Sequence, residues 1–450
     1  MRISRFITYL RSLDIDLHLE GDRLQISAPR GVLTAELREE LADRKDEILT
    51  FLQAEDDSQQ MDIASPNFAL SRPTFIPLSY SQERFWFLQE LDRGQVSHVL
   101  GDILKLVGPL NIAALEKSLQ EILRRHETLR TIYRVLDDKP IQIVQEDAGF
   151  SLDIVDLSYF PIDEREDKAK ELIKQWDDHS IDLTQDLMLQ ARLLRIQEQE
   201  HILVINIHHI SSDGWSMGVF WRELSVIYSG LIKGETISLP ELPFQYADYA
   251  VWQREWLRGA RRRSQLAYWR DQLRDLAVQD LPTDRPRTVD LTNRGSYEDF
   301  LLSADLLKQL KELSKREQVT LFMILVAVLS LLLKRYSGLD DIAVGTAVAN
   351  RRIPEIENII GLFLNTLVLR TDLSGNPTFS QLMKRVGDVA LDAYDNQDVP
   401  FEMLLKDLQP ERNLNRTPYF QVMIILQNMP KSSLSLPGIK VQPVDLQGQT

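Results

Sequence analysis

The segment "HILVINIHHISSDG", which begins at residue 201, constrains the fold of this chain more than any other. Its apolar run, residues 201–207, is typical of a buried strand, and the run ends abruptly in two adjacent histidines, His208 and His209. Asp213 and Gly214 follow, and a helical pattern of apolar residues continues from Gly214. The sequence therefore predicts a strand, a tight turn and a helix, with two imidazoles at the junction.

Neighbouring side chains on a strand point to opposite faces, so we expect one histidine to face a cavity and the other to pack in the scaffold. Asp213 is expected to close the turn by pairing with a basic residue. Gly214 lets the backbone approach a substrate and presents a free N–H at the start of the helix. This pattern favours a base that takes a proton from an incoming nucleophile, beside an oxyanion-binding N–H. No serine or cysteine nucleophile is implied, so an acyl group would pass directly from donor to acceptor.

The histidine pair has two other interpretations. Adjacent histidines also occur as ordinary core residues, and the pair alone does not exclude this. A zinc site is not predicted, because no third ligand lies at a suitable spacing. The remaining histidines are His18, His98, His126, His179 and His201.

Composition limits the class of protein. The chain has 450 residues, more than one core usually holds, so two or three units are expected. A formal net charge of −15 argues against nucleic acid or an anionic membrane as partner, and the absence of cysteine excludes thiolate catalysis. The longest apolar run, residues 321–333, is shorter than the roughly 20 residues of a membrane span and predicts a buried helix. With no signal peptide visible, we expect a soluble, cytoplasmic protein.

The first 55 residues have the pattern of a separate small unit. Residues 1–55 read as a helix, a hairpin and a second helix. The hairpin, residues 16–27, turns at Gly21-Asp22 and leaves an edge strand free to pair with another chain. Residues 56–73 are polar and contain prolines, which is typical of a linker.

The rest of the chain alternates helical and strand patterns, which predicts a mixed α/β fold. We expect two lobes, residues 74–255 and 256–450. The polar, proline-bearing segment 279–296 is expected to cross from one lobe to the other.

Further motifs accompany the histidine pair in a fixed order. They are "LSYSQERFWFL" (78–88), "RHETLRTIY" (125–133), "YADYAVWQ" (246–253), "IGLFLNTLVLR" (360–370), "NQDVPFE" (396–402) and "NRTPYFQVMIILQN" (415–428). Together with "HHISSDG", they resemble the motifs of condensation domains of nonribosomal peptide synthetases over about residues 75–450. In the last motif, Thr417-Pro418-Tyr419 stands in place of the common Asn-Pro-Leu.

Residues 1–53 separately resemble the N-terminal docking domains of the TubC type, whose pattern runs almost unbroken from Leu10 to Leu52. In that family the exposed hairpin captures a short motif at the C-terminal tail of the upstream synthetase subunit. The resemblance therefore implies that residues 16–27 bind such a tail, which agrees with the free edge strand expected there.

These resemblances imply a two-lobed, chloramphenicol-acetyltransferase-like α/β fold preceded by a small α+β docking domain. The implied enzyme is an acyltransferase that forms an amide bond between a carrier-bound donor acyl or peptidyl thioester and the amine of a carrier-bound aminoacyl thioester. No cofactor would belong to this chain. The 4′-phosphopantetheine arms of the donor and acceptor carrier domains would enter opposite ends of a tunnel and meet at His209. Neither nucleic acid nor a membrane would take part.

The resemblance also assigns roles around the histidine pair. The second histidine, His209, would be catalytic, by deprotonating or orienting the acceptor amine and stabilising the tetrahedral intermediate, while His208 would be structural. Asp213 would be a structural acid paired with Arg294 or Arg130. We favour Arg294, because a crossover arginine would also tie the two lobes together.

Four further residues receive supporting roles. Gly214 would bring its backbone to the site, and Arg125 would either hold its helix against the site or lie on a solvated face. Trp252 would be scaffold, and Asn365 would offer its amide to the tunnel.

Two rival functions come from other classes. A free-standing acyltransferase could make esters or amides from soluble acyl-CoA, but such an enzyme needs no docking unit. A scaffold without activity would only bind carriers, and the intact His209, Asp213 and Gly214 argue against it. The segment 94–106 lacks the Tyr-Asn pair common in the family, which indicates an unusual donor such as a polyketide or fatty acyl chain. The "SSDGWS" sequence favours an L-configured donor.

The end of the chain carries one more prediction. "IKVQPVDL" (439–446) is predicted as a strand of the C-terminal lobe. The family usually continues with another core strand and a closing helix, so we expect this lobe to be incomplete at its end. The chain would then be a fragment of a longer synthetase, with adenylation and carrier domains downstream.

Overall fold

The structure is a computed structural model of the chain. It describes residues 6, 7, 10, 15–20, 23–29, 32, 34–45, 47–49, 72–92, 98–146, 149–177, 180–277, 279–284, 295–410, 417–427 and 433–444. Apart from Arg72 and Pro73, the predicted linker at 56–73 lies outside the described residues.

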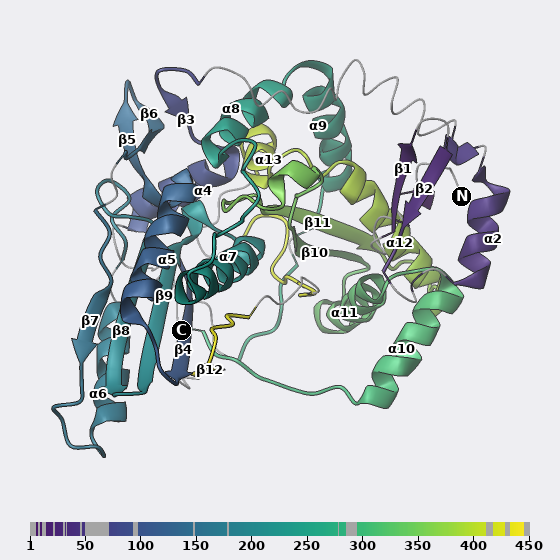
Figure 1. The fold of residues 1–450 in the computed structure, drawn as a ribbon. Coiled ribbons are helices and arrows are strands. Elements are labelled where there is room, and N and C mark those ends of the chain that lie inside the picture. Colours follow the sequence, from purple (N-terminus) through teal and green to yellow (C-terminus); the bar gives the residue numbers. More distant parts are fainter. Residues whose placement is uncertain are drawn as a thin grey trace.

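The N-terminal lobe is built on a five-stranded sheet whose order is β12-β4-β9-β8-β7 (Figure 1). Its strands are β4 (Val99–Val107), β7 (Asp153–Asp156), β8 (Leu189–Gln197), β9 (Glu200–His208) and β12 (Lys440–Pro443). Only β7 and β8 pair in parallel; the other neighbours among these strands are antiparallel.

The central strand β9 alternates its side chains between two cores. Leu203, Ile205 and Ile207 belong to the core under α5 (Ile112–Arg125) and α7 (Gly214–Lys233). Ile202 and Val204 belong to the core under α6 (Arg165–Asp177). Helices therefore cover both faces of the strand, which is why its sequence is apolar without interruption.

A smaller sheet of order β3-β6-β5 lies beside the end of β9. Its strands are β3 (Ile76–Pro77), β5 (Thr131–Leu136) and β6 (Lys139–Val144), and the helix α4 (Tyr80–Asp92) follows β3. Gln82 of α4 donates to the hydroxyl of Tyr133 at 3.0 Å and to the carbonyl of Ile210 at 3.4 Å. These bonds hold α4 against the segment that follows β9.

The C-terminal lobe packs helices around the antiparallel pair β10 (Asp341–Val348) and β11 (Asn365–Asp372). Its helices are α9 (Gly259–Leu273), α10 (Ala304–Glu317), α11 (Leu321–Ser337), α12 (Phe379–Asp395) and α13 (Phe401–Leu408). Thr320 caps α11 by accepting a hydrogen bond from the N–H of Met323 at 3.2 Å, and Gly338 ends it in the left-handed conformation, with φ of 72°. The helix predicted at 321–333 is thus confirmed, but only one side of it is buried, since Val328, Leu331 and Leu332 are exposed.

Helix α8 (Tyr246–Trp256) leads from the N-terminal lobe into the C-terminal lobe, whereas the segment predicted as a crossover lies in sequence between α9 and α10, both helices of the C-terminal lobe. Of the predicted crossover at 279–296, residues 285–294 lie outside the described residues. The described part that leads into α10 has no regular secondary structure (Figure 1).

The N-terminal unit contains the predicted hairpin. Strands β1 (Asp16–Glu20) and β2 (Arg23–Ser27) pair antiparallel with Glu20 opposite Arg23, the register of a two-residue turn. Thr34 caps α2 (Ala35–Asp43) by accepting from the N–H of Leu37 at 3.2 Å. Buried apolar residues of this unit are contiguous with the core of the C-terminal lobe.

One predicted strand belongs to the other lobe. Residues 439–446 are predicted as a strand of the C-terminal lobe, but β12 pairs with β4 at the edge of the N-terminal sheet. Leu434 and Leu436, which lead into β12, are buried in the N-terminal core. The lobe assignment is wrong because the alternation of a strand does not specify which sheet its edge will join.

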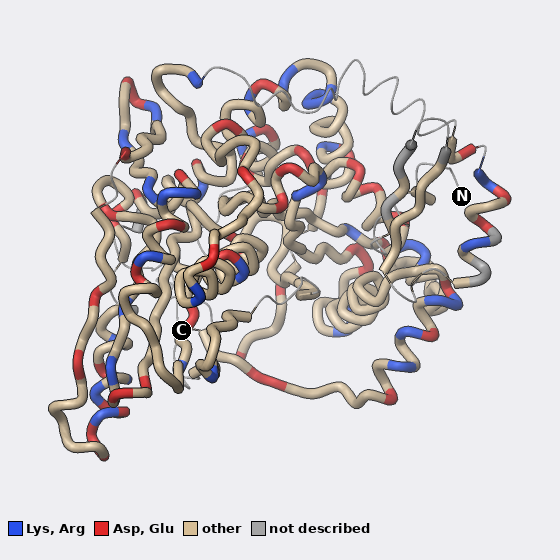
Figure 2. Tube along the Cα trace, in the orientation of Figure 1, with Lys and Arg blue, Asp and Glu red and all other residues tan. Residues whose placement is uncertain are grey.

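Exposed helices carry charges of both signs. Acidic and basic side chains are interspersed along α6 and α10 (Figure 2). In the described part of the chain no single helix is long and apolar enough to cross a membrane, and α10 with α11 meets that criterion only as a pair bent by 101°.

Candidate active site

The two histidines lie at a change of secondary structure. Strand β9 ends at His208, and a short 3₁₀ helix, His209–Ser211, follows it. The imidazole of His208 closes this turn, because its Nδ1 accepts the N–H of Ile210 at 3.0 Å. We call residues 208–211 the histidine turn. His209 lies on the 3₁₀ helix rather than on the strand, so the alternation of strand side chains does not decide where its ring points.

His208 is a structural residue of this turn. Only 1% of its surface is exposed. Burial, followed by the nearby His98 and His209, lowers the pKa of His208 to about 3. Its ring is therefore neutral at neutral pH, and its bond from Ile210 fixes the proton on Nε2.

His209 presents one ring nitrogen outward. Its backbone N–H donates to the carbonyl of His98 at 2.8 Å, which fixes its position. Its Nδ1 is buried without a hydrogen-bond partner, so Nε2 is the ring nitrogen that reaches solvent. Burial lowers the pKa of His209 below its usual value, although the Asp213 carboxylate opposes the shift. A neutral imidazole with an accessible Nε2 is suited to accept a proton.

The serine of the histidine turn and the serine that follows it are engaged elsewhere. Ser211 donates to the carbonyl of Thr128 at 2.9 Å, and the hydroxyl of Ser212 lies 3.4 Å from the carbonyl of Asp213. Among the described residues no serine hydroxyl bonds to His209, and the chain has no cysteine. The arrangement therefore lacks the nucleophile of a serine or cysteine acyltransferase.

Asp213 is held by groups from both lobes. Its Oδ1 accepts the N–H and the hydroxyl of Ser216 at 2.8 and 2.7 Å, so that Asp213 caps α7. Its Oδ2 accepts the N–H of Phe363 at 3.0 Å. Arg351 donates to Oδ1 at 3.2 Å, and the two side chains are only 1% and 2% exposed. We call Asp213, Ser216, Arg351 and Phe363 the Asp213 cluster.

Of the two arginines predicted to pair with Asp213, Arg130 is wrong, and the described residues do not include Arg294. Arg130 donates to the carbonyl of Leu123 at 3.1 Å and to that of Gln145, and it thereby braces the end of α5. Arg294 lies outside the described residues. Arg351 is the residue that sequence reasoning missed, although "ANRR" directly after the β10 pattern marks two cations at a strand end. The expectation that the arginine ties the lobes together holds for Arg351.

The loop before β11 is fastened to α7 and α8 by further bonds. Trp215 donates to the carbonyl of Glu357 at 2.9 Å, and the hydroxyl of Tyr246 donates to that of Leu362 at 2.6 Å. Gly361 lies so close that a Cβ there would come within 2.0 Å of the Tyr246 ring. The backbone of Gly361 thus packs directly on the Tyr246 ring, and any residue with a Cβ at this position would clash.

Gly214 lies at the start of a helix, as predicted, and Arg125 holds its helix in place, which is one of the two roles predicted for it. Gly214 is exposed and is the first residue of α7, where backbone N–H groups have no partner within the helix. Arg125 binds the buried Glu223 of α7 at 3.1 Å, and His126 reaches the same carboxylate at 2.9 Å. Arg125 thus clamps α5 to α7 rather than lying on a solvated face.

Asn365 and Trp252 lie in the scaffold. The amide of Asn365 donates to the carbonyls of Gln397 and Val399 at 2.7 and 3.0 Å, and its oxygen accepts the N–H of Phe401 at 3.0 Å. Because these bonds engage the Asn365 amide in holding the segment before α13, the amide is not free to bind a substrate. Trp252 stacks on Trp256, with ring centroids 4.9 Å apart.

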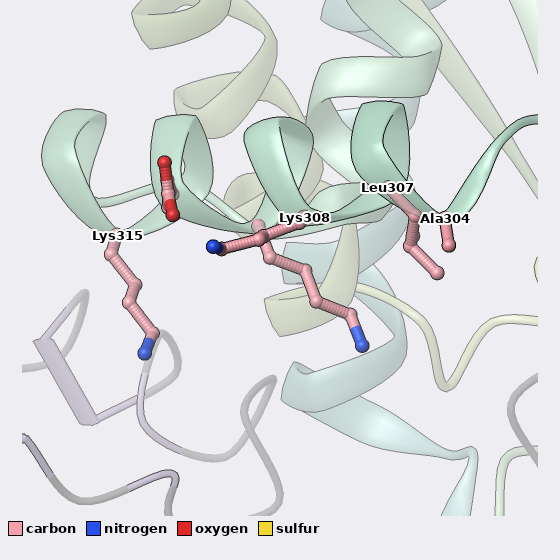
Figure 3. A pocket seen from close by; sticks show the side chains of 6 residues that line it. Ala304, Leu307, Lys308 and Lys315 are labelled. Atoms are coloured by element: carbon pink, nitrogen blue, oxygen red, sulfur yellow. The ribbon is translucent and has the colours of Figure 1, made fainter.

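A hollow of about 420 Å³ lies apart from the histidine turn, along α10 (Figure 3). Its lining residues are Ala304, Leu307, Lys308, Lys311, Glu312 and Lys315. None of the predicted site residues lines it. Within the described residues no group of three or more His, Asp or Glu side chains is arranged to hold a metal ion.

The family of the chain follows from comparison with known proteins. The family model of the condensation domain matches residues 73–447, and that of the TubC N-terminal docking domain matches residues 3–54. The chain therefore belongs to the condensation domain family and carries a TubC-type docking domain ahead of it. Both sequence resemblances are confirmed.

Individual relatives are peptide synthetases. The chain is 44% identical over 386 residues to one of the linear gramicidin synthase subunits of Brevibacillus parabrevis, in an alignment that covers 86% of this chain and 8% of the relative. It is 41% identical over 382 residues to malpinin synthetase of Mortierella alpina, and that alignment covers 84% of this chain and 5% of the synthetase. The chain thus spans a small part of the length of these relatives.

Solved structures confirm the predicted fold. The X-domain from teicoplanin biosynthesis superposes with a TM-score of 0.76 at 28% identity, covering 84% of each chain. The first condensation domain of the calcium-dependent antibiotic synthetase gives a TM-score of 0.66 at 18% identity, covering 84% of this chain and 85% of that one. The second likeness concerns the fold alone.

Proposed function

We propose that this chain transfers a donor acyl or peptidyl group from a carrier thioester to the amine of an aminoacyl thioester on a second carrier. Membership of the condensation domain family supports the reaction class. The observation that carries the proposal is the geometry of His209, a neutral imidazole with an accessible Nε2 and no serine or cysteine nucleophile beside it. An acyl group can therefore be passed only to a nucleophile that the substrate brings.

The chemistry at His209 is a direct substitution at the thioester carbonyl. The acceptor nitrogen attacks the carbonyl carbon, the C–N bond forms, the C–S bond breaks, and the thiol leaves with a proton. His209 accepts the proton that the nitrogen loses. Because an α-ammonium has a reference pKa of about 8, modest help in deprotonation and good positioning suffice. The backbone N–H of Gly214, an exposed residue at the N-terminus of α7, is suited to the oxyanion.

The carriers supply the reactive arms. We propose that 4′-phosphopantetheine on donor and acceptor carrier domains reaches His209 from opposite sides, and that this chain contributes no cofactor of its own. Adenylation and carrier domains downstream and a cytoplasmic location belong to the same proposal. The synthetases among the relatives support it.

The reaction is tested by loading carriers and following amide formation through intact-protein mass. A panel of acyl and aminoacyl groups on carrier proteins is run beside the same acyl groups on coenzyme A. We expect a product with the carrier-bound donor and acceptor, and none with the His209→Ala variant. A product formed equally well from soluble acyl-CoA would replace this proposal with the free-standing acyltransferase.

We further propose that the hairpin at 16–27 binds the C-terminal tail of an upstream synthetase subunit. The match to the TubC docking domain supports this, and the side chains of Gln25, Ile26 and Ser27 on β2 are exposed. Deleting residues 1–53 should preserve the reaction at high carrier concentration and abolish it at low concentration, because tethering supplies effective concentration. Efficient coupling by the truncated protein under dilute conditions would contradict the proposal.

A further inference from the structure

No carboxylate orients the imidazole of His209 through its buried nitrogen. A ring nitrogen that does chemistry is commonly held by a hydrogen bond from the other nitrogen to a carboxylate or carbonyl. Here Nδ1 of His209 is buried without a hydrogen-bond partner. The Asp213 carboxylate is taken up by Ser216, Arg351 and Phe363. The backbone carbonyls of His209 and Ser212 lie near enough to the ring to oppose the lowering of its pKa. No side chain orients the ring through its buried nitrogen, so packing is the further restraint on the plane of the imidazole.

An aromatic ring lies flat against this imidazole. Phe85 of α4 stacks on His209 with ring centroids 4.7 Å apart and an angle of 20° between the planes. His98 meets the same phenyl ring edge-on, at 5.4 Å and 80°. The backbone of His209 is bonded to the carbonyl of His98 at 2.8 Å. The phenyl face therefore fixes the remaining freedom, the rotation of the imidazole about its side-chain bonds.

Phe85 is itself positioned from both lobes. It packs against the cluster that contains Tyr133 and Ile210, next to the histidine turn. It also packs against the cluster that contains Ile359 and Phe363 of the C-terminal lobe. A phenyl ring with neighbours on both sides has little freedom to tilt, so it provides a firm surface for the imidazole.

We propose that Phe85 is the positioning residue of His209, and that its ring holds the imidazole in the plane that turns Nε2 outward. The kinetic test of this proposal rests on the proposed function, whereas the stacking of Phe85 on His209 does not. It assigns to a stacked aromatic ring the part that a carboxylate plays in hydrogen-bonded catalytic histidines. Loss of the flat face should slow the chemical step more than it weakens substrate binding.

The test compares Phe85→Leu and Phe85→Tyr with Phe87→Leu. Phe87 lies on the same helix, and 61% of its surface is exposed, so it is a matched control. We expect Phe85→Leu to lower kcat for amide formation about 10- to 100-fold while KM changes by less than about threefold. Phe85→Tyr, which keeps the flat face, and Phe87→Leu should stay within about twofold of the parent protein. If Phe85→Leu does not fold, Phe85→Met takes its place.

A second measurement does not depend on activity. Nitrogen-15 spectra of labelled histidine report the protonation state of His209 in each variant. In Phe85→Leu we expect the His209 ring signals to move and its pKa to rise toward the ordinary value, because the phenyl ring contributes to its burial. Kinetics and ring signals that match the parent protein would overturn the proposal, and so would equal damage by Phe85→Tyr and Phe85→Leu. If the parent protein forms no amide with any carrier pair, the proposed function fails, and the spectra alone decide the role of Phe85.

Discussion

The histidine turn and the Asp213 cluster adjoin each other in sequence, yet they are held in opposite ways. In the Asp213 cluster both carboxylate oxygens accept hydrogen bonds, and an arginine from the other lobe compensates the charge. In the histidine turn a nitrogen of each imidazole is buried without a partner. Buried polar atoms that lack partners cost stability and are retained where chemistry needs them. The first region holds the fold together, and the second is available for reaction.

The largest expected effect is the loss of the buried charge pair. Asp213→Ala leaves the Arg351 guanidinium buried and uncompensated, which should lower the free energy of unfolding by about 3–5 kcal/mol. Urea denaturation measures the change. Asp167→Ala on the exposed face of α6 is the control, and it should change stability by less than about 0.5 kcal/mol. Equal stability of the Asp213 variant and the parent protein would refute the fastening role.

The next effect concerns the chemistry and not the fold. His209→Ala should lower the rate of amide formation by at least about 100-fold, the usual range for a positioned acid–base group, without changing the melting temperature. His208→Ala should act mainly on folding, because its imidazole closes the turn. Equal losses of rate in two well-folded variants would contradict the division of roles between the two histidines.

The decline in the free energy of unfolding at acidic pH should depend on the protonation of His208. In the unfolded chain a histidine takes up a proton below about pH 6.5, whereas burial keeps the folded His208 neutral down to about pH 3. Its contribution is therefore complete above pH 6.5 and is lost as pH falls toward 3, at up to about 1.4 kcal/mol per pH unit. His208→Asn, whose amide oxygen can accept the same N–H, should show a shallower decline between pH 6 and 4. The same slope in both proteins would show that His208 does not set it.

The smallest effect tests the hydroxyl at the centre of the Asp213 cluster. Ser216→Ala removes contacts to Asp213, Arg351 and Gly361 but leaves the ion pair, so it should cost about 1–2 kcal/mol in urea denaturation. Ser118→Ala is the matched control, because the Ser118 hydroxyl donates only within its own helix, to Ala114. A cost for Ser216 no greater than that for Ser118 would mean that Asp213 and Arg351 fasten the lobes without it.

Local elements of the fold followed from local sequence. The apolar run before His208 and the helical pattern from Gly214 predicted β9 and α7, because both patterns depend on neighbouring residues. The apolar run 321–333 likewise predicted α11. The alternating pattern predicted two lobes, and the motif resemblance added which two-lobed fold they form.

Pairings between distant residues could not be predicted in the same way. Arg351 follows Asp213 by 138 positions, and only the packing of the loop before β11 onto α7 brings them together. The partner sheet of β12 was misassigned for the same reason. The stacking of Phe85 on His209 carries no signal in the sequence beyond the aromatic residues of the motif at 78–88. Tertiary contacts decided each of these cases.

The return of the chain from one lobe to the other has a mechanical consequence. Residues 417–427 run beside β10 of the C-terminal lobe, and residues 434–443 are embedded in the N-terminal lobe as β12 and its approach. The lobes are thus attached at β12 as well as at the Asp213 cluster, at Trp215 and at Tyr246. Any rotation of one lobe against the other must leave all of these contacts in place or break one of them, so each added attachment removes rotations that the lobes could otherwise make.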